Sequence, residues 1–148
     1  VWHPELDTIG KRYQALENTQ DKMKYLTILY NHKLLSTQLD IQIIKLTHTN
    51  NQQPQSGDKV SYNYKCWLLS NGKELDSSYK KGKPYEYQID SFSVIKGINS
   101  VLKNINYGER VIAIIPSICA YGSSGIKNLI PPNSDIGFEI ELLNKNLE

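Results

Sequence analysis

The sequence predicts an α+β protein in which antiparallel strands alternate with one short helix, preceded by a helical N-terminal arm. In the first part of the chain, apolar positions recur at steps of three and four, which is helical spacing. From Leu39 onward they alternate, which is typical of strands. One apolar segment, residues 94–105, fits no more than one or two helical turns. We therefore expect a helical extension over residues 1–37 and an α+β domain over residues 38–148.

The N-terminal arm carries a single stripe of mostly apolar positions. Asn18 and Asp21 are expected to begin a helix within it, because an Asn side chain accepts free backbone N–H groups and an early acidic residue suits the helix dipole. One or two helices fit the segment. The arm either packs on its own domain or mediates dimerisation or docking into a larger assembly. The stripe consists of Ile9, Tyr13, Leu16, Gln20, Met23, Thr27, Tyr30 and Leu34.

The remaining chain contains five segments with strand patterns. The first places Leu39, Ile41 and Ile43 on one face, and a polar loop follows it. Ser-Asn-Gly-Lys after the second segment predicts a hairpin, because Asn and Gly tolerate positive φ. Tyr85 and Tyr87 share a face of the third segment. The strands are expected within residues 39–46, 59–69, 84–89, 106–116 and 135–143.

Length, charge and cysteine content exclude several classes of protein. A chain of 148 residues predicts one domain, and a net charge of +2 with interspersed acids and bases argues against a nucleic-acid-binding surface. No apolar run approaches the roughly 18 residues needed to span a membrane. Cys66 and Cys119 fit no metal-binding spacing. They are either two buried thiols or, in an oxidising compartment, one disulfide.

The residue types offer little for covalent or acid–base chemistry. His3, His32 and His48 all precede the strand-rich domain or lie at its start. The sequence has no Gly-x-Ser-x-Gly elbow, no phosphate-binding Gly-Lys loop and no dinucleotide fingerprint. It also lacks a local cluster of metal ligands, so neither a metal nor a cofactor is expected. Its many Tyr, Ile, Val and Leu residues suit binding of an apolar group, or a reaction without proton transfer.

From about Gly57 to Leu143 the sequence resembles the FKBP-type peptidyl-prolyl cis-trans isomerases. The shared blocks, in order, are Leu-Asp-Ser-Ser, Gly-Lys-Pro-aromatic, Val-Ile-x-Gly, Gly-Glu-x, Ala-Tyr-Gly and Ile-Pro-Pro-Asn. The resemblance implies a five- or six-stranded antiparallel sheet wrapped around one short helix. A pocket for proline would lie between that helix and the concave face of the sheet. Residues 120–132 would form the long loop that overhangs it, and loops of that length are usually functional.

The same resemblance implies a role for ten residues of this pocket. Tyr121 or the backbone N–H of Ile95 would bind a substrate carbonyl, Asp76 would orient neighbouring groups, and the apolar walls would exclude water from a twisting X–Pro amide. The catalytic positions are Asp76, Tyr121, Ile98 and Phe138, and the substrate-binding positions are Tyr64, Leu75, Tyr85, Val94, Ile95 and Ile130.

Several of these residues also have a purely structural interpretation. Val94 and Phe138 would serve equally well as ordinary core residues. Tyrosines are common at half-buried strand positions, and an Asp before Ser77 can cap a turn. Tyr121 could hydrogen-bond its own loop instead of a ligand.

Two positions depart from the family pattern. Ile98 stands where Trp is usual, and Leu75 where Phe is usual. We predict reduced isomerase activity and weaker binding of macrolides such as tacrolimus and rapamycin, by about 1–3 kcal/mol for the lost aromatic contacts. These departures favour an alternative function, a non-catalytic binding or assembly subunit. Asp76, Tyr121 and the Ile-Pro-Pro block at 130–132 favour the isomerase.

The resemblance also bears on partners and location. Proline-containing polypeptides are the expected clients. Some bacterial members of the family use helical N-terminal arms to dimerise or to hold unfolded clients in the cell envelope. We therefore expect an envelope location, periplasmic or lipid-anchored, in preference to the cytoplasm, and a homodimer or larger assembly if the arm is an interface.

Overall fold

The computed structural model describes residues 7–32 and 40–145. The expected boundary between residues 37 and 38 lies outside the described residues, as do Leu34 and Leu39. The helices are α1 (Asp7–Ala15), α2 (Thr19–Asn31), α3 (Ser78–Lys81) and α4 (Lys96–Lys103), with a 3-10 turn at η2 (Ser117–Cys119). The strands are β1 (Gln42–Lys45), β2 (Lys59–Leu68), β3 (Glu74–Ser77), β4 (Tyr85–Gln88), β5 (Arg110–Ile115) and β6 (Ile136–Leu142).

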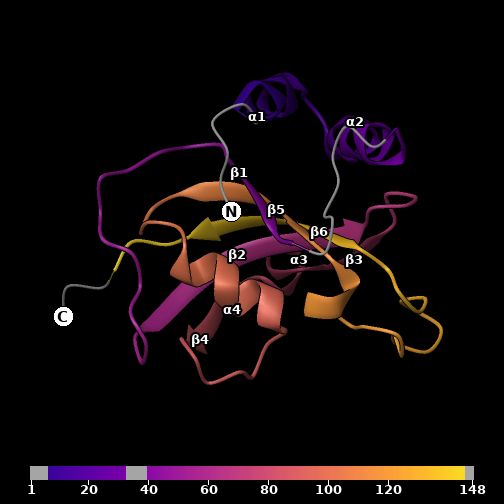
Figure 1. The fold of residues 1–148 in the computed structure, drawn as a ribbon. Coiled ribbons are helices and arrows are strands. Elements are labelled where there is room, and N and C mark those ends of the chain that lie inside the picture. The colour runs from indigo at the N-terminus through magenta and orange to yellow at the C-terminus, as the bar shows by residue number, and fades with distance from the viewer. Residues whose placement is uncertain (1–6, 33–39, 146–148) are drawn as a thin grey trace.

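The strands form one antiparallel sheet in the order β1-β5-β6-β2-β3 (Figure 1). β4 also pairs with β2, because β2 is long enough to hold two partners along one edge. Residues 59–62 of β2 pair with β4 and residues 65–67 pair with β3, while β6 occupies the other edge. The predicted fold is confirmed: an antiparallel sheet surrounds one short helix, α4, and two helices precede it.

The main core lies between α4 and the concave face of the sheet. Helix α4 buries Ile98, Val101 and Leu102 against apolar side chains of β2, β5 and β6. Gly97 permits this close packing, since a Cβ atom there would lie 2.5 Å from Ile115 Cγ2. A helix of eight residues is marginal on its own, and so the packing stabilises it.

Helices α1 and α2 cover the opposite face of the sheet (Figure 1). Tyr13, Met23 and Leu26 are buried there, in a second apolar cluster with Trp67 and other side chains of β1, β2 and β5. The described part of the arm therefore packs on its own sheet, which is the first of the two arrangements expected for it.

A side-chain cap fixes the start of α2, and the break before α2 decides which side chains of the arm are buried. The Asn18 side chain accepts a hydrogen bond from the backbone N–H of Asp21 at 2.8 Å and caps α2, as predicted. Because the helical phase breaks between α1 and α2, Gln20 is exposed, and Leu26 rather than Thr27 is fully buried.

The first strand differs from its prediction. It begins at Gln42 rather than residue 39, and both Ile43 and Ile44 are buried. Ile43 faces the main core, whereas Ile44 contacts the helical arm. The same double coverage explains the uninterrupted apolar run of β5, since both faces of a covered strand are buried.

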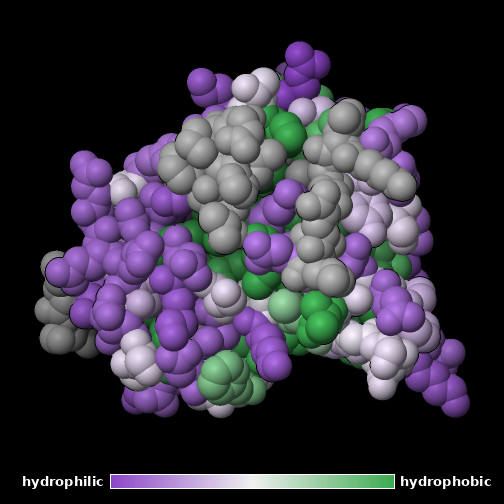
Figure 2. Space-filling view, viewed as in Figure 1, coloured by the Kyte–Doolittle hydropathy of each residue, from purple (hydrophilic) through white to green (hydrophobic). Residues whose placement is uncertain are grey.

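The face of the molecule in Figure 2 is largely polar. Figure 2 shows hydrophilic side chains over most of the face that it presents, with hydrophobic groups in small separate patches. Neither in residues 7–32 nor in 40–145 does any helix combine the length and hydrophobicity that crossing a membrane requires.

Candidate active site

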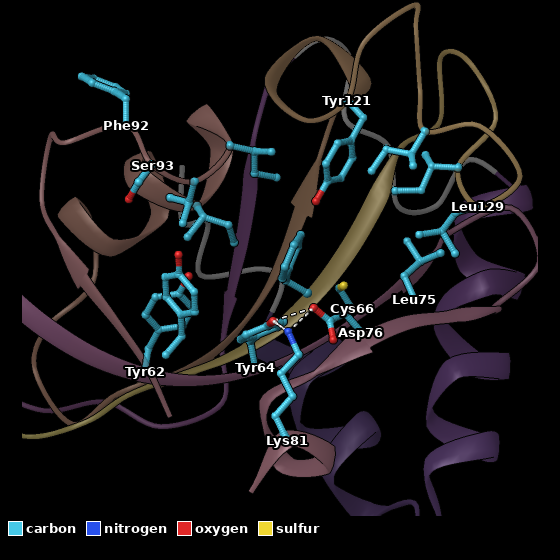
Figure 3. Close-up of a pocket in the computed structure, with 17 residues that line it drawn as sticks. Tyr62, Tyr64, Cys66, Leu75, Asp76, Lys81, Phe92, Ser93, Tyr121 and Leu129 are labelled. Carbon is cyan, nitrogen blue, oxygen red and sulfur yellow. Dashed lines mark hydrogen bonds and ion pairs between the residues drawn. The ribbon is translucent and has the colours of Figure 1, made fainter. Parts of the chain in front are cut away.

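A cavity of about 740 Å³ opens between the concave face of the sheet, α4 and the loop that joins β5 to β6 (Figure 3). All ten residues singled out from the sequence line it. They are Tyr64, Leu75, Asp76, Tyr85, Val94, Ile95, Ile98, Tyr121, Ile130 and Phe138. Residues from seven segments of the chain thus converge on one site.

Strand alternation builds the sheet side of the cavity. Tyr62, Tyr64 and Cys66 are two residues apart along β2 and therefore share its inner face. Phe138 of β6 is the register partner of Cys66, and its ring centroid lies 6.2 Å from that of Tyr64. Tyr85 of β4 lies at the rim, with its ring centroid 5.7 Å from that of Tyr62.

A polar group of three residues closes one side of the cavity. The Tyr64 hydroxyl donates to Asp76 Oδ2 at 2.7 Å, and Lys81 Nζ donates to the same oxygen at 3.0 Å (Figure 3). Burial alone would raise the pKa of Asp76, but these two donors, together with the backbone N–H of Ser77 and the charge of Lys81, outweigh it and hold the pKa below its usual range. Burial and the bond to Asp76 raise the pKa of Tyr64 to about 12. At neutral pH, Asp76 is therefore ionised and Tyr64 is neutral.

Two hydrogen-bond donors in the cavity have no acceptor among the residues that the structure describes. The Tyr121 side chain extends from the loop with its hydroxyl directed into the cavity (Figure 3), and no described residue pairs with it. Burial raises the pKa of Tyr121, so its proton is retained and available. The backbone N–H of Ile95, at the cap of α4, also has no acceptor within residues 7–32 and 40–145. An apolar cavity with two free donors suits a ligand carbonyl.

The β5–β6 loop, which runs from Pro116 to Asp135, forms the overhanging side. Ile130, expected to overhang the cavity, lines it as a buried residue of this loop, and Ile126 and Leu129, which also line it, are each 40% exposed. A backbone hydrogen bond from Ile126 to Ile130 at 2.8 Å holds this turn. In Figure 3, Leu129 and Leu75 lie on the side of the cavity opposite Phe92 and Ser93.

The segment before α4 forms the opposite rim and is held by a buried amide. Asn99 Oδ1 accepts from the Tyr87 hydroxyl and from the backbone N–H of Asp90, and Asn99 Nδ2 donates to Asp90 Oδ1. Phe92 projects from this segment and is 61% exposed. Its φ of 58° is rare for an aromatic residue.

Seven residues that line the cavity were not predicted from the sequence. The period-two pattern of β2 would have found Tyr62 and Cys66 once Tyr64 was placed. Apolar residues within a polar loop would have pointed to Ile126 and Leu129. Lys81 depends on the short helix α3, which no pattern predicts. The seven are Tyr62, Cys66, Lys81, Phe92, Ser93, Ile126 and Leu129.

Both cysteines are free thiols in this structure. Cys66 is buried at the cavity wall, and burial raises its pKa to about 12. Cys119 is half-buried in η2. The Cys66 thiol is therefore neutral and contributes an apolar surface rather than a nucleophile.

Comparisons with known proteins agree with this geometry. The family model described as FKBP-type peptidyl-prolyl cis-trans isomerase matches residues 50–143. FkpA of Escherichia coli, named as an isomerase of this type, is 40% identical over 111 residues, which are 75% of this chain. The chain spans only 39% of the length of that relative.

A yeast relative and a solved structure extend the match. FK506-binding protein 1 of Kluyveromyces lactis is 36% identical over 108 residues, covering 72% of this chain and 94% of that protein. The crystal structure of FkpA from Escherichia coli matches with a TM-score of 0.67 at 31% identity, over 84% of this chain and 63% of that one. The chain therefore belongs to the FKBP-type peptidyl-prolyl cis-trans isomerase family.

Proposed function

We propose that the cavity catalyses cis-trans isomerisation of X–Pro bonds in polypeptides. The observation that carries this proposal is the pair of unpaired donors, the Tyr121 hydroxyl and the Ile95 N–H, in a cavity otherwise walled by apolar side chains. These donors would hold one carbonyl of the substrate while the amide turns. The apolar residues Ile98, Val94 and Phe138 would contact the proline ring.

Desolvation would lower the barrier to rotation about the X–Pro bond. The barrier to rotation about a peptide bond, about 18–20 kcal/mol, arises from amide resonance, and uncatalysed X–Pro exchange takes tens to hundreds of seconds. Twisting the amide localises the nitrogen lone pair and makes the group less dipolar. A water-excluding cavity thus stabilises the twisted amide relative to the planar one, and fixed donors add to that difference.

Asp76 acts in this proposal as an orienting group rather than a base. Its Oδ2 atom already accepts from Tyr64 and Lys81, and its pKa is below the usual range, so it is a poor proton acceptor at neutral pH. It fixes the Tyr64 ring, whose face contributes to the cavity wall.

The cavity floor tunes the activity. Ile98 is only 2% exposed and supplies an aliphatic surface where the family usually has Trp. We infer activity, and affinity for FK506-type macrolides, reduced by about 1–3 kcal/mol relative to a Trp-bearing member. Leu75 would contribute in the same direction.

The test is exchange spectroscopy by NMR on a short Leu-Pro-Phe peptide. The wild-type chain should accelerate exchange, and Ile98→Trp should accelerate it further. Tyr121→Phe removes one donor and should lower kcat/KM about twofold to tenfold, the value of one hydrogen bond. Tyr79→Phe is the control, since Tyr79 is exposed and lies outside the cavity. The proposal would be contradicted if Tyr79→Phe lost activity while Tyr121→Phe kept it, or if neither the wild type nor any variant catalysed exchange.

A second candidate is a non-catalytic binding subunit that retains the cavity. The aliphatic residues Ile98 and Leu75 favour it, because they remove aromatic surface from the site. Its signature would be an inactive wild type, with activity appearing in Ile98→Trp.

The client proteins, the assembly and the location form a separate part of the proposal. The arm uses Tyr13, Met23 and Leu26 on its own sheet, which favours a monomer over a dimer built on that face. Light scattering on the full chain distinguishes the two. An envelope location, expected from the helical arm, is tested by fractionating the source cells.

A further inference from the structure

One carboxylate holds the base of the β5–β6 loop. Asp135 is the last residue before β6, and Ser117 is the second residue after β5. Asp135 Oδ1 accepts the backbone N–H of Ser117 at 2.9 Å, so this bond joins the two ends of the loop. The backbone carbonyl of Asp135 also accepts the N–H of Leu69 at 3.3 Å, which ties the same point to the end of β2.

The N-terminal arm binds the other oxygen of that carboxylate. The Tyr30 hydroxyl, near the end of α2, donates to Asp135 Oδ2 at 2.6 Å. Burial and this bond raise the pKa of Tyr30 to about 12, so the hydroxyl remains a donor at neutral pH. The position of Tyr30 is set by α2, which Met23 and Leu26 hold against the sheet.

A short series of backbone bonds connects the clamp to the cavity. Gly122 donates to the carbonyl of Ser117 at 2.8 Å, and Asn133 donates to the carbonyl of Gly122 at 2.9 Å. Gly125 donates to the carbonyl of Tyr121 at 3.0 Å. Tyr121 therefore lies in a turn that is fixed at two points. Gly122 bonds to Ser117, which Asp135 holds, and it also bonds to Asn133 near the end of the same loop.

We propose that Tyr30 and Asp135 are positioning residues for Tyr121, so that the helical arm orients the catalytic loop. The inference rests on the proposed isomerase function and deepens it. The arm and α4 lie on opposite faces of the sheet (Figure 1). The bonds from Tyr30 to Asp135 and from Ser117 to Asp135 connect the arm to the loop that overhangs the cavity. Without the Tyr30 hydroxyl, Asp135 Oδ2 turns toward water, the loop base loosens, and the Tyr121 hydroxyl is less well placed.

The chain provides a matched control in the same arm. Tyr13 donates to Glu139 Oε1 at 2.7 Å, a bond of the same kind, but Glu139 lies in the middle of β6 and not on the loop. Tyr13→Phe and Tyr30→Phe each remove one hydroxyl from the contact between arm and sheet. A merely structural role for Tyr30 would lower stability in both variants and slow exchange in neither.

The experiment compares these variants by NMR exchange on the Leu-Pro-Phe peptide, at a temperature where both are folded by circular dichroism. Tyr30→Phe should lower kcat about threefold to tenfold, with a smaller change in KM, since loosening one donor costs roughly one hydrogen bond. Tyr13→Phe should retain the wild-type rate. Asp135→Asn, which keeps an acceptor for Ser117, should retain more activity than Asp135→Ala.

A second readout is independent of activity. In ¹⁵N spectra, Tyr30→Phe should shift the backbone amides of Ser117, Tyr121 and Gly122, and Tyr13→Phe should leave them in place. If the wild type is inactive but Tyr30→Phe still shifts these amides, the proposed function is wrong and the coupling between arm and loop stands. An active wild type whose Tyr30→Phe variant keeps the full rate would overturn the positioning role, whether or not the amides shift.

Discussion

At the scale of single residues, Asp76 shows how the site separates charge from catalysis. Among the described residues it is the one carboxylate that lines the cavity, and two donors occupy its Oδ2 atom. Tyr121, by contrast, presents a protonated hydroxyl with no partner among the described residues. The charged group is engaged and the neutral donor is free, which suits a reaction in which no proton moves.

The ionisation of Asp76 provides a prediction at this scale. Its folded-state pKa lies below the usual value of about 3.9. Because the pKa is lower in the folded state than in the unfolded one, the carboxylate stabilises the fold above about pH 3.9, and this contribution disappears as the pH falls through the folded-state pKa. Lys81→Met removes a donor and should raise the pKa of Asp76.

Carboxyl-carbon NMR titration measures this change directly. Lys80→Met is the control, because Lys80 pairs with Glu74 and not with Asp76. An Asp76 pKa that Lys81→Met leaves unmoved would show that Lys81 is not what holds the carboxylate ionised.

Site residues differ in how far the sequence could predict them. Asp76 and Tyr121 lie in blocks whose order and spacing resemble a known family, and Phe138 lies in the strand segment that follows the last block, so their convergence could be predicted. Lys81 and Phe92 could not, because their positions depend on a four-residue helix and on a left-handed backbone conformation, neither of which has a periodic signal.

At the scale of elements, the position of helix α4 depends on its close packing against the sheet at Gly97. Strands and helices were largely predictable, since apolar alternation marks β2 and β6 and a continuous apolar run marks β5. Burial of both faces of β1 was not, because one strand in isolation does not show what covers its second face. The break between α1 and α2 could not be predicted either, because the apolar stripe with its three-and-four spacing continues through it.

Gly97→Ala tests the packing of α4. The added methyl group would meet Ile115 Cγ2 at 2.5 Å and the Cys119 carbonyl oxygen at 3.1 Å. We expect a loss of about 1–3 kcal/mol in the free energy of unfolding, which is typical of overpacking. Ser100→Ala, at a half-exposed position of the same helix, should change it by less than about 0.5 kcal/mol. Urea denaturation measures both, and equal stabilities would contradict the close approach.

At the scale of the whole molecule, the sheet separates two apolar clusters, one around α4 and one beneath α1 and α2. The sequence predicted both the helical arm and the sheet. It could not decide where the arm docks, because an apolar stripe fits an intramolecular face as well as a partner. The structure places Tyr13 and Met23 of that stripe, together with Leu26, against the sheet, and so joins the described part of the arm to the isomerase fold.

Leu26→Ala tests whether the arm and sheet unfold as one unit. Leu26 is fully buried between them, and its truncation should cost about 2–5 kcal/mol. In a Trp2→Phe background, fluorescence reports on Trp67, which lies in the same cluster. Circular dichroism and Trp67 fluorescence should then change together at one denaturant midpoint, lower than that of the parent. Helix loss that precedes the Trp67 change would show that the arm is a separate unit.

The central claim is that a proline-containing chain binds in the cavity with a carbonyl on the two free donors. The most direct measurement is a ¹⁵N titration of the wild-type chain with the Leu-Pro-Phe peptide. We expect the Ile95 amide signal to move downfield as the amide gains a hydrogen bond, with further shifts at other residues lining the cavity, such as Tyr121 and Leu129. Shifts confined to α1 and α2, with the Ile95 amide unmoved, would contradict it.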